Sequence, residues 1–294
     1  MYIPYFRGKQ FDLLALKESV PDGLLAKDTV PLIEPVRDSA HLRKTLEAFI
    51  KHEREILVID NPEVGQVQKG VVKIHEIKDL FDGLYVTPVY LLNHSFNPAW
   101  IKREDFIFLS KSYLKDILAE VGSYRPRYHI ITDSARLRKA VPNNRVLLTD
   151  PFTRLSNGAD YLELEDEFYS DDSKYFKEDG YIGYSNYGID GEAYYDKVYP
   201  SRSMVLHILY LDRYKSVRIK HFVSDSNDSV ANPAGKFFEA LKKLTEWHSR
   251  YEKEVPLTKG LEELLSYHDR GTYPGTGIIK KLSVMHQLEI FDKL

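Results

Sequence analysis

Short apolar segments alternate with stretches of helical periodicity along the first two-thirds of the chain. The segments recur about every 25 residues, roughly the length of one strand and one helix. Because they are apolar throughout rather than at alternate positions, they are typical of strands buried on both faces, as in a parallel sheet. The eight segments are residues 2–6, 30–33, 56–59, 84–90, 106–109, 129–132, 146–149 and 181–184.

Helical stretches separate these segments. After the second segment, Asp38 or Ser39 can cap a helix whose apolar face carries Leu42, Leu46 and Phe49. Repeated strand–helix units predict an α/β fold, and an open doubly wound sheet would show the same alternation. The sequence contains neither GxGxxG nor GxxxxGK[ST], the phosphate loops that such open sheets often carry. Eight strands favour closure, so we predict a TIM-type (β/α)8 barrel.

The pattern changes after residue 203. Residues 204–211 and 217–223 are two β-rich runs that predict a hairpin, and Asn232-Pro233 begins a long amphipathic helix. Residues 257–268 and 276–292 predict two further helices. We therefore expect a barrel body at 1–203 and an added β-hairpin with C-terminal helices at 204–294, packed together as one compact domain.

Three segments contain more apolar, acidic or aromatic residues than the packing of their predicted elements requires. Val284 and Ile290 widen the last helix's apolar surface beyond one face, and we expect the surplus to contact another protein chain. Residues 166–179 are acidic with interleaved aromatics, which favours a solvated helix over a cation-binding loop. The tyrosines from 181 to 199 suit a lining of the barrel mouth, a partner-binding surface or the packed floor of a long loop.

Composition narrows the class of protein. Hydrophobic residues make up 43% and charged residues 29%, as in ordinary packed domains, and the net charge of −3 gives no indication of nucleic-acid binding. There is no cysteine, which excludes disulfides, thiolate metal sites and a cysteine nucleophile. The first ten residues include Arg7 and Lys9 and are not typical of a signal peptide, and no stretch predicts a membrane helix. We expect a cytoplasmic protein.

Several long motifs run through most of the chain. They are YFRGKQFDLLALKE, VPLIEPV, VIDNP, TDPF, ADYLELEDEFYSDDSKYF, GYIGYSNYGIDG, VLHILYLD and HFVSDSNDSVANPAGKFFEAL. With these motifs the chain resembles the bacterial and phage-associated "beta" family of uncharacterised proteins. The resemblance implies a barrel-like fold and, since some members are encoded beside nuclease-like genes in mobile or defence regions, a role in phage defence with a nuclease-like protein partner. It brings no active site.

In a (β/α) barrel, functional groups project from the C-terminal ends of the strands. Four carboxylates, an amide and two cations there would suit a divalent cation and a phosphate. The same residues also suit helix caps, turns before proline and an Arg7–Glu34 ion pair. If they contact a ligand, Glu34→Gln or Asp60→Asn abolishes activity without lowering the melting temperature. The candidate pocket residues are Arg7, Glu34, Asp60, Asn61, Lys111, Asp133 and Asp150.

Two further polar groups lie outside the barrel. His207 and His221 can face each other across the hairpin, where core histidines with satisfied nitrogens are favoured over a metal or acid–base couple. Asp225, Asn227 and Asp228 precede the long helix and suit a solvated loop more than a cation or sugar site.

Two functions therefore stay open. The first is a non-catalytic or regulatory barrel protein that acts through a protein partner, with a homo-oligomer also compatible with the sequence. It depends on the missing catalytic motifs and on the family resemblance. The second is a metal-assisted barrel enzyme acting on a phosphorylated or nucleotide-like small molecule. It depends on the charged ring at the strand ends. Because a fold does not confer a function, only the geometry of that ring can separate them.

Overall fold

The computed structural model describes residues 1–68, 77–196, 200–252 and 255–294. The chain divides into two compact units, Met1–Asp150 with Asp172–Gly188, and Pro151–Asp171 with Ile189–Leu294. The chain thus passes between the units three times, whereas the sequence pattern placed one change of architecture after residue 203.

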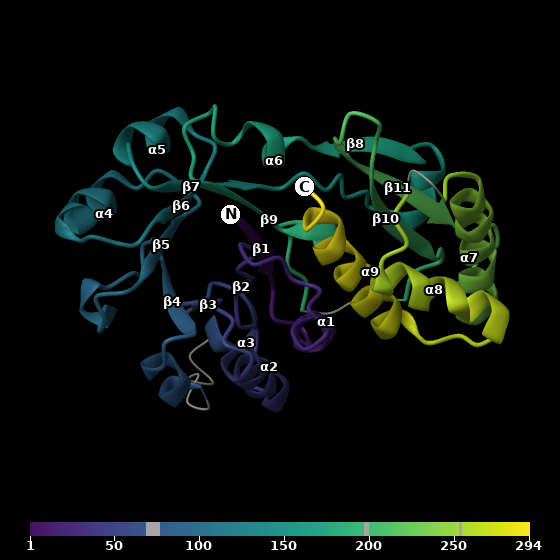
Figure 1. Ribbon diagram of the computed structural model, residues 1–294, viewed down its shortest axis with the longest axis horizontal. Helices are drawn as coiled ribbons and strands as arrows, with labels where there is room; N and C mark the ends of the chain where they lie inside the picture. The colour runs from purple at the N-terminus through teal and green to yellow at the C-terminus, as the bar shows by residue number, and fades with distance from the viewer. Residues whose placement is uncertain (69–76, 197–199, 253–254) are drawn as a thin grey trace. The chain divides into compact units, whose positions relative to one another are not determined.

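The first unit is a closed barrel of eight parallel strands, as the sequence predicted (Figure 1). Each strand pairs with the next along the chain, and β9 closes the ring by pairing with β1 through Tyr2 and Tyr184. This order is expected because right-handed strand–helix–strand units place successive strands side by side. The strands are β1 (Tyr2–Phe6), β2 (Leu32–Ile33), β3 (Ile56–Ile59), β4 (Val86–Leu91), β5 (Ile107–Ser110), β6 (His129–Thr132), β7 (Arg145–Thr149) and β9 (Gly183–Asn186).

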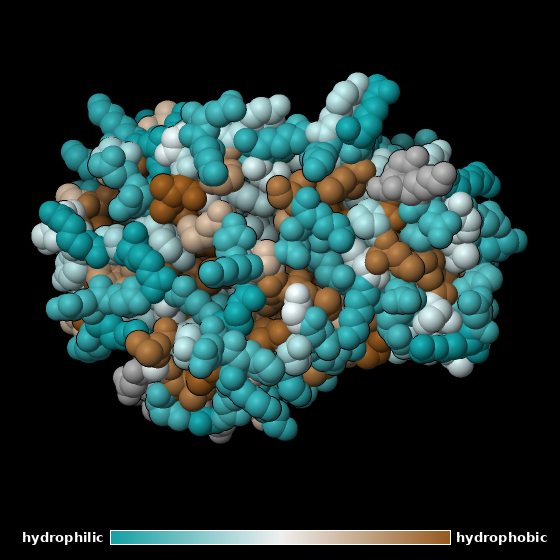
Figure 2. Space-filling view, in the orientation of Figure 1, coloured by the Kyte–Doolittle hydropathy of each residue, from teal (hydrophilic) through white to brown (hydrophobic). Residues whose placement is uncertain are grey.

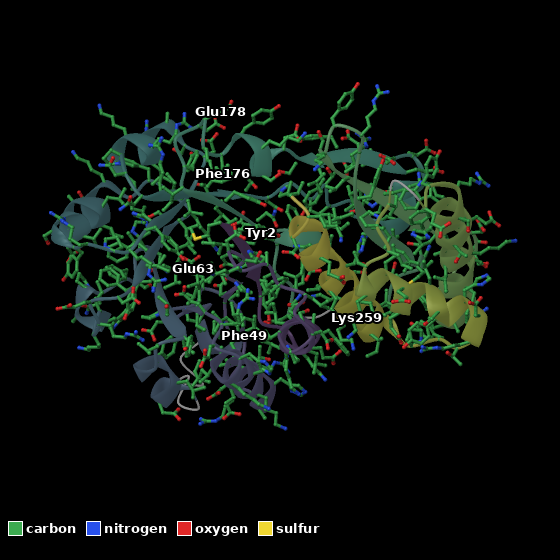
Figure 3. The ribbon with its side chains drawn as sticks, in the orientation of Figure 1. Tyr2, Phe49, Glu63, Phe176, Glu178 and Lys259 are labelled. Carbon is green, nitrogen blue, oxygen red and sulfur yellow. The ribbon has the colours of Figure 1, made fainter. Side chains whose placement is uncertain are left out.

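Short helices connect the strands. The Ser39 hydroxyl accepts a hydrogen bond from the Leu42 N–H and so caps α2, whose apolar face buries Phe49 completely (Figure 3). The α-helices are α1 (Gln10–Ser19), α2 (Ala40–Lys51), α3 (Gly65–Gln68), α4 (Lys115–Glu120), α5 (Ala135–Ala140) and α6 (Asp172–Tyr175). The 3-10 turns are η1 (Lys78–Asp82), η2 (Pro98–Trp100) and η3 (Val121–Ser123).

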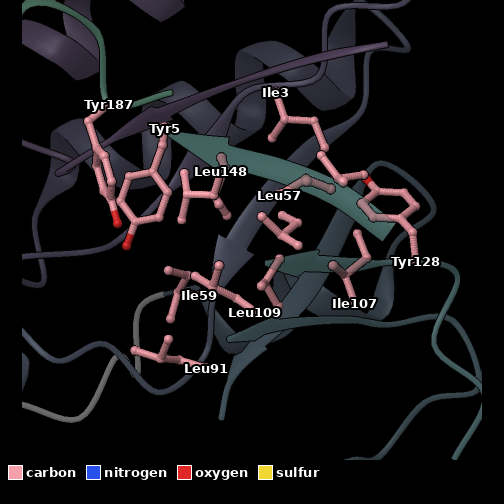
Figure 4. Packing of buried hydrophobic residues seen from close by; sticks show 14 residues of the cluster. Ile3, Tyr5, Leu57, Ile59, Leu91, Ile107, Leu109, Tyr128, Leu148 and Tyr187 are labelled. Carbon is pink, nitrogen blue, oxygen red and sulfur yellow. The ribbon is translucent and has the colours of Figure 1, made fainter. Parts of the chain in front are cut away.

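Alternate residues of the strands fill the barrel interior. Successive side chains of a strand point to opposite faces, so only every second residue enters the interior. The interior cluster includes Tyr5, Ile59, Leu109, Leu148 and Tyr187, all buried (Figure 4). A separate cluster on the outer side of the wall contains Tyr90 and Phe108. This alternation decides which residues at the strand ends can line the barrel mouth.

The second unit is built on a three-stranded sheet with the order β10–β11–β8. The predicted hairpin is confirmed, since β10 and β11 are antiparallel and place His207 opposite His221. The helix α7 contacts both strands, and the Asn232 side chain caps its first turn. The elements are η4 (Gly158–Leu162), β8 (Asp166–Ser170), η5 (Gly188–Asp190), β10 (Val205–Leu211), β11 (Val217–Val223), α7 (Pro233–Arg250), α8 (Lys259–Arg270) and α9 (Thr276–Phe291).

The helix expected at 166–179 is wrong for its first part, because β8 pairs with β11 there. Asp166 accepts hydrogen bonds from Arg218 at 2.7 Å and from the Tyr210 hydroxyl at 2.8 Å. These contacts come from residues more than 40 positions away in the chain. Tertiary pairing therefore overrides the local helical pattern.

The last helix does not leave an apolar face for a partner at the two expected residues. Val284 and Ile290 are 2% and 0% exposed within this chain. In the second unit, α9 contacts α8 and β10, and His286 Nε2 donates to the carbonyl of Leu209 at 2.7 Å. The surplus apolar surface that the sequence assigned to a second protein is thus buried by the chain itself.

Candidate functional site at the barrel mouth

The alternation of side chains sorts the seven candidate residues. Arg7 and Lys111 each follow an interior residue, Tyr5 or Leu109, by two positions and so share its face. Glu34 and Asn61 stand in the same relation to Leu32 and Ile59, and Asp150 to Leu148. Asp60 and Asp133 have the opposite parity, so their side chains belong to the outer face of the barrel wall.

Glu34 forms the buried centre of the site. Its side chain is 0% exposed, and its Oε2 accepts a hydrogen bond from the Tyr5 hydroxyl at 2.5 Å and contacts the Arg7 guanidinium. Its Oε1 accepts the backbone N–H of Glu63 at 2.8 Å, which fixes the loop after β3. Such a buried carboxylate is tolerated because both oxygens are hydrogen-bonded and a cation compensates the charge.

The buried charges shift the pKa values of their neighbours. Burial, and then the charge of Glu34, raise the pKa of Tyr5 well above 10. Burial alone would lower the pKa of Arg7, but the negative charge of Glu34 and its hydrogen bond to the guanidinium act in the opposite direction, and the net shift is upward. Tyr5 therefore stays a neutral hydrogen-bond donor and Arg7 stays a cation throughout the physiological range.

Two cations lie over one pair of aromatic rings. The rings of Tyr5 and Tyr187 have centroids 4.5 Å apart, and Figure 4 shows them side by side with their hydroxyls pointing the same way. The Arg7 guanidinium carbon lies 5.2 Å from both centroids, and Lys111 Nζ lies 5.7 and 5.9 Å from them. These distances are within the range of cation–π attraction.

Glu63 stands beside Lys111, with 3.7 Å between its Oε2 and Lys111 Nζ. Its other oxygen accepts a hydrogen bond from Asn93 Nδ2 at 2.8 Å. Glu63 is labelled in Figure 3, and its side chain is 36% exposed against 17% for Lys111. The site thus has a buried half, Arg7 with Glu34, and a more accessible half, Lys111 with Glu63.

The other candidate residues lie outside this cluster of charges and tyrosines, and most of them contact other parts of the fold. Asn61 exchanges two hydrogen bonds of 2.8 Å with the backbone of Leu91 and so ties β3 to β4. Asp60 lies on the outer face, where burial and then its charge raise the pKa of Tyr90 to about 12. Asp133 pairs with Arg138 at the surface and accepts the Tyr181 hydroxyl at 3.1 Å. Asp150 is exposed. Glu34, Asp60, Asp133 and Asp150 therefore do not converge on one point.

No group of three His, Asp or Glu side chains in the described part of the chain is arranged to hold a metal ion. The sequence interpretation missed Tyr5, Glu63 and Asn93, whereas Tyr187 was among the tyrosines expected as one alternative to line the barrel mouth. Alternation could have found Tyr5 and Asn93, because each has interior parity on its strand or just beyond it. Glu63 could not be found in this way, since it belongs to a loop whose path depends on Glu34.

In the histidine pair of the second unit, His221 is buried and His207 is half-buried, and the two rings pack in the core as favoured from the sequence. The two Nδ1 atoms of His207 and His221 lie 2.6 Å apart, and His221 Nε2 lies 3.3 Å from Glu167. Burial, and then the charge of His221, lower the pKa of His207 to about 3. Burial also lowers the pKa of His221. The pair is therefore a neutral core contact in which His207 Nδ1 and both ring nitrogens of His221 have partners.

Two other sequence features have structural explanations. The loop containing Asp225 is held by Glu239, which accepts the backbone N–H groups of Asp225 and Ser226 at 2.7 and 2.9 Å. Of the tyrosine-rich segment, Tyr184 and Tyr187 are buried and serve packing, Tyr195 is exposed, and Tyr199 lies outside the described residues.

Comparison with protein-family models, curated proteins and solved structures finds no match to the chain. The resemblance to the "beta" family therefore stays a prediction. Within the described ranges, no helix has both the length and the apolar character needed to cross a bilayer.

Proposed function

We propose that the barrel binds a small anionic molecule at the C-terminal ends of its strands, through a phosphate group that contacts Lys111. The observation that carries this proposal is the placement of two cations, Arg7 and Lys111, over the Tyr5–Tyr187 ring pair. Ligands of (β/α) barrels bind at the C-terminal ends of the strands, and the two cations lie at this same end.

The residues have different roles in this proposal. Arg7 is held by Glu34 and keeps the tyrosine pair in place, so we assign it a positioning role. Lys111 Nζ lies 3.7 Å from Glu63 Oε2, a long ion-pair distance at which an anionic ligand group can compete with the carboxylate. Without a ligand, the charges of Arg7, Lys111, Glu34 and Glu63 sum to zero. A bound anion adds negative charge to the site, and this charge is compensated only if the Glu63 carboxylate turns away or takes up a proton.

Glu63 is the carboxylate best placed for proton transfer with such a ligand. It stands beside Lys111, and its side chain is 36% exposed, so it can exchange a proton with solvent or with a ligand hydroxyl. A barrel that acts on a phosphorylated or nucleotide-like small molecule would use this pair, with Lys111 binding the anion and Glu63 acting as acid or base.

The partner-dependent regulatory function has less support. The last helix was the surface expected to contact another protein chain, and its residues Val284 and Ile290 are buried by this chain itself. The face drawn in Figure 2 is largely hydrophilic, with hydrophobic residues in separate patches. A defence-associated role with a nuclease-like partner stays a prediction of the family resemblance.

Calorimetric titration with inorganic phosphate, pyrophosphate and ribose 5-phosphate tests the proposed site. We expect at least one of these to bind the unmodified chain, and Lys111→Met to weaken that binding about tenfold, since a charge-assisted hydrogen bond contributes about 1.5–3 kcal/mol. The control is Lys115→Met, which removes an exposed lysine from the start of α4. Equal weakening in both variants, or no binding of any probe, would overturn the proposal.

A further inference from the structure

The second unit contains a pocket that the barrel site does not involve. It has a volume of about 300 Å³ and lies between β11 and α7, with Leu162 and Glu165 at one side. Lys243, Trp247 and Arg250 are spaced four and three residues apart and therefore share one face of α7. Lys220 and Phe222 of β11 form the opposing wall. This volume is at the small end of the range for small-molecule sites.

Aromatic rings form one side of the pocket. The Trp247 ring lies 5.4 Å from Phe222, 5.3 Å from Tyr210 and 5.8 Å from Tyr251. Phe222 is buried, while Trp247 is partly exposed and Tyr251 is 47% exposed. The packed rings of Tyr210 and Phe222 hold the Trp247 indole in place, so that its exposed part offers a rigid surface on which another planar ring can stack.

Cations stand beside this surface. Lys243 donates to the Val223 carbonyl and to Asp225, so its charge is already used within the fold. Lys220 has weaker contacts, 3.9 Å from both Glu165 and Asp166. Arg250 is exposed at the C-terminal end of α7 and makes no hydrogen bond or ion pair with the described residues. Lys220 and Arg250 are therefore the two cations that a ligand can reach.

The remaining charged groups leave the pocket slightly cationic. Its lining carries Lys220, Lys243 and Arg250 against Glu165 and Glu246, three positive charges against two negative ones. Glu246 stands 4.0 Å from Lys242 outside the pocket. His221 lines the pocket only through its backbone, because its side chain is 0% exposed.

We infer that this pocket binds a planar aromatic ring that carries one anionic group, the chemistry of a nucleoside monophosphate. The ring stacks on Trp247 and Tyr251, and the anionic group contacts Arg250 and Lys220. Stacking of a base on an aromatic side chain combined with a nearby cation is a general means of holding nucleotides without reading their sequence. The inference does not depend on the function proposed for the barrel.

The fluorescence of Trp247 provides a direct test. The chain has two tryptophans, so Trp100→Phe leaves Trp247 as the sole reporter. In this background, AMP is titrated beside adenosine, inorganic phosphate and benzoate, an aromatic ring with a carboxylate. We expect saturable quenching by AMP, by benzoate or by both, and binding at least tenfold weaker for adenosine and for phosphate alone. The response to AMP and benzoate identifies whether a phosphate or a carboxylate is preferred.

Charge variants then locate the binding site. Arg250→Gln and Lys220→Gln should each weaken binding about tenfold. Lys242→Gln removes an exposed cation from the same helix outside the pocket and should leave binding unchanged, as should Lys111→Met in the barrel. Thermal melting of each variant confirms that it is folded. Phosphate alone quenching as well as AMP, equal weakening by Lys242→Gln, or no saturable quenching by any probe would overturn the inference.

Discussion

The Arg7 guanidinium contacts the Glu34 carboxylate between the adjacent strands β1 and β2, where the two side chains are 6% and 0% exposed. Removing one partner of a buried pair leaves the other charge uncompensated, at a cost of about 3–5 kcal/mol. The same carboxylate accepts the Tyr5 hydroxyl and the Glu63 N–H. One buried group thus orients parts of three strand–loop segments at the barrel mouth.

Glu34→Gln should therefore lower the free energy of unfolding by about 3 kcal/mol, because Arg7 stays charged without its counterion. Urea denaturation measures this change. Asp133→Asn removes the surface partner of Arg138 and should cost less than about 1 kcal/mol. This expectation reverses the sequence-based one for Glu34, whose substitution was to leave the melting temperature unchanged. If both variants lose equally little, the buried pair does not stabilise the barrel.

Acid should destabilise the protein through its buried histidines. Burial lowers the pKa of His286 to about 4 and that of His129 to about 4, below the ordinary 6.5. The unfolded chain then binds more protons than the folded chain between these values, so stability is complete above pH 6.5 and falls as the pH drops towards 4. Each histidine contributes up to about 1.4 kcal/mol per pH unit in that window.

Denaturation curves of His286→Gln between pH 7 and 4.5 test the acid effect. The variant loses the neutral imidazole that links Thr258 and Leu209, and it should show a slope of stability against pH that is smaller by up to one proton. His94→Gln changes an exposed histidine and should keep the slope of the unmodified chain. An unchanged slope in His286→Gln would contradict the assignment of this proton uptake to His286.

The sequence predicted the barrel because its signal is repeated eight times, once for each strand. It located the site only in part, because a strand end has two faces and closeness to that end does not decide which face a side chain takes. Asp60 and Asn61 are neighbours, yet Asn61 reaches the backbone of Leu91 while Asp60 acts on Tyr90. Glu63 and β8 were beyond prediction because their positions depend on partners distant in the chain, Glu34 and Arg218.

The close approach of α8 and α9 should make Gly260 intolerant of any side chain. A Cβ there would stand 2.5 Å from the Leu282 carbonyl oxygen and 2.6 Å from the His286 nitrogen, both backbone atoms that cannot rotate away. Gly260→Ala should lower the free energy of unfolding by about 1–3 kcal/mol, the usual cost of overpacking, even though alanine favours helix.

Gly122→Ala is the matched control, because a Cβ at Gly122 meets nothing within 4 Å. It should be neutral or stabilising by up to about 1 kcal/mol. Chemical denaturation of the two variants measures the difference, and a Gly260→Ala protein as stable as Gly122→Ala would show that the two helices do not pack this closely.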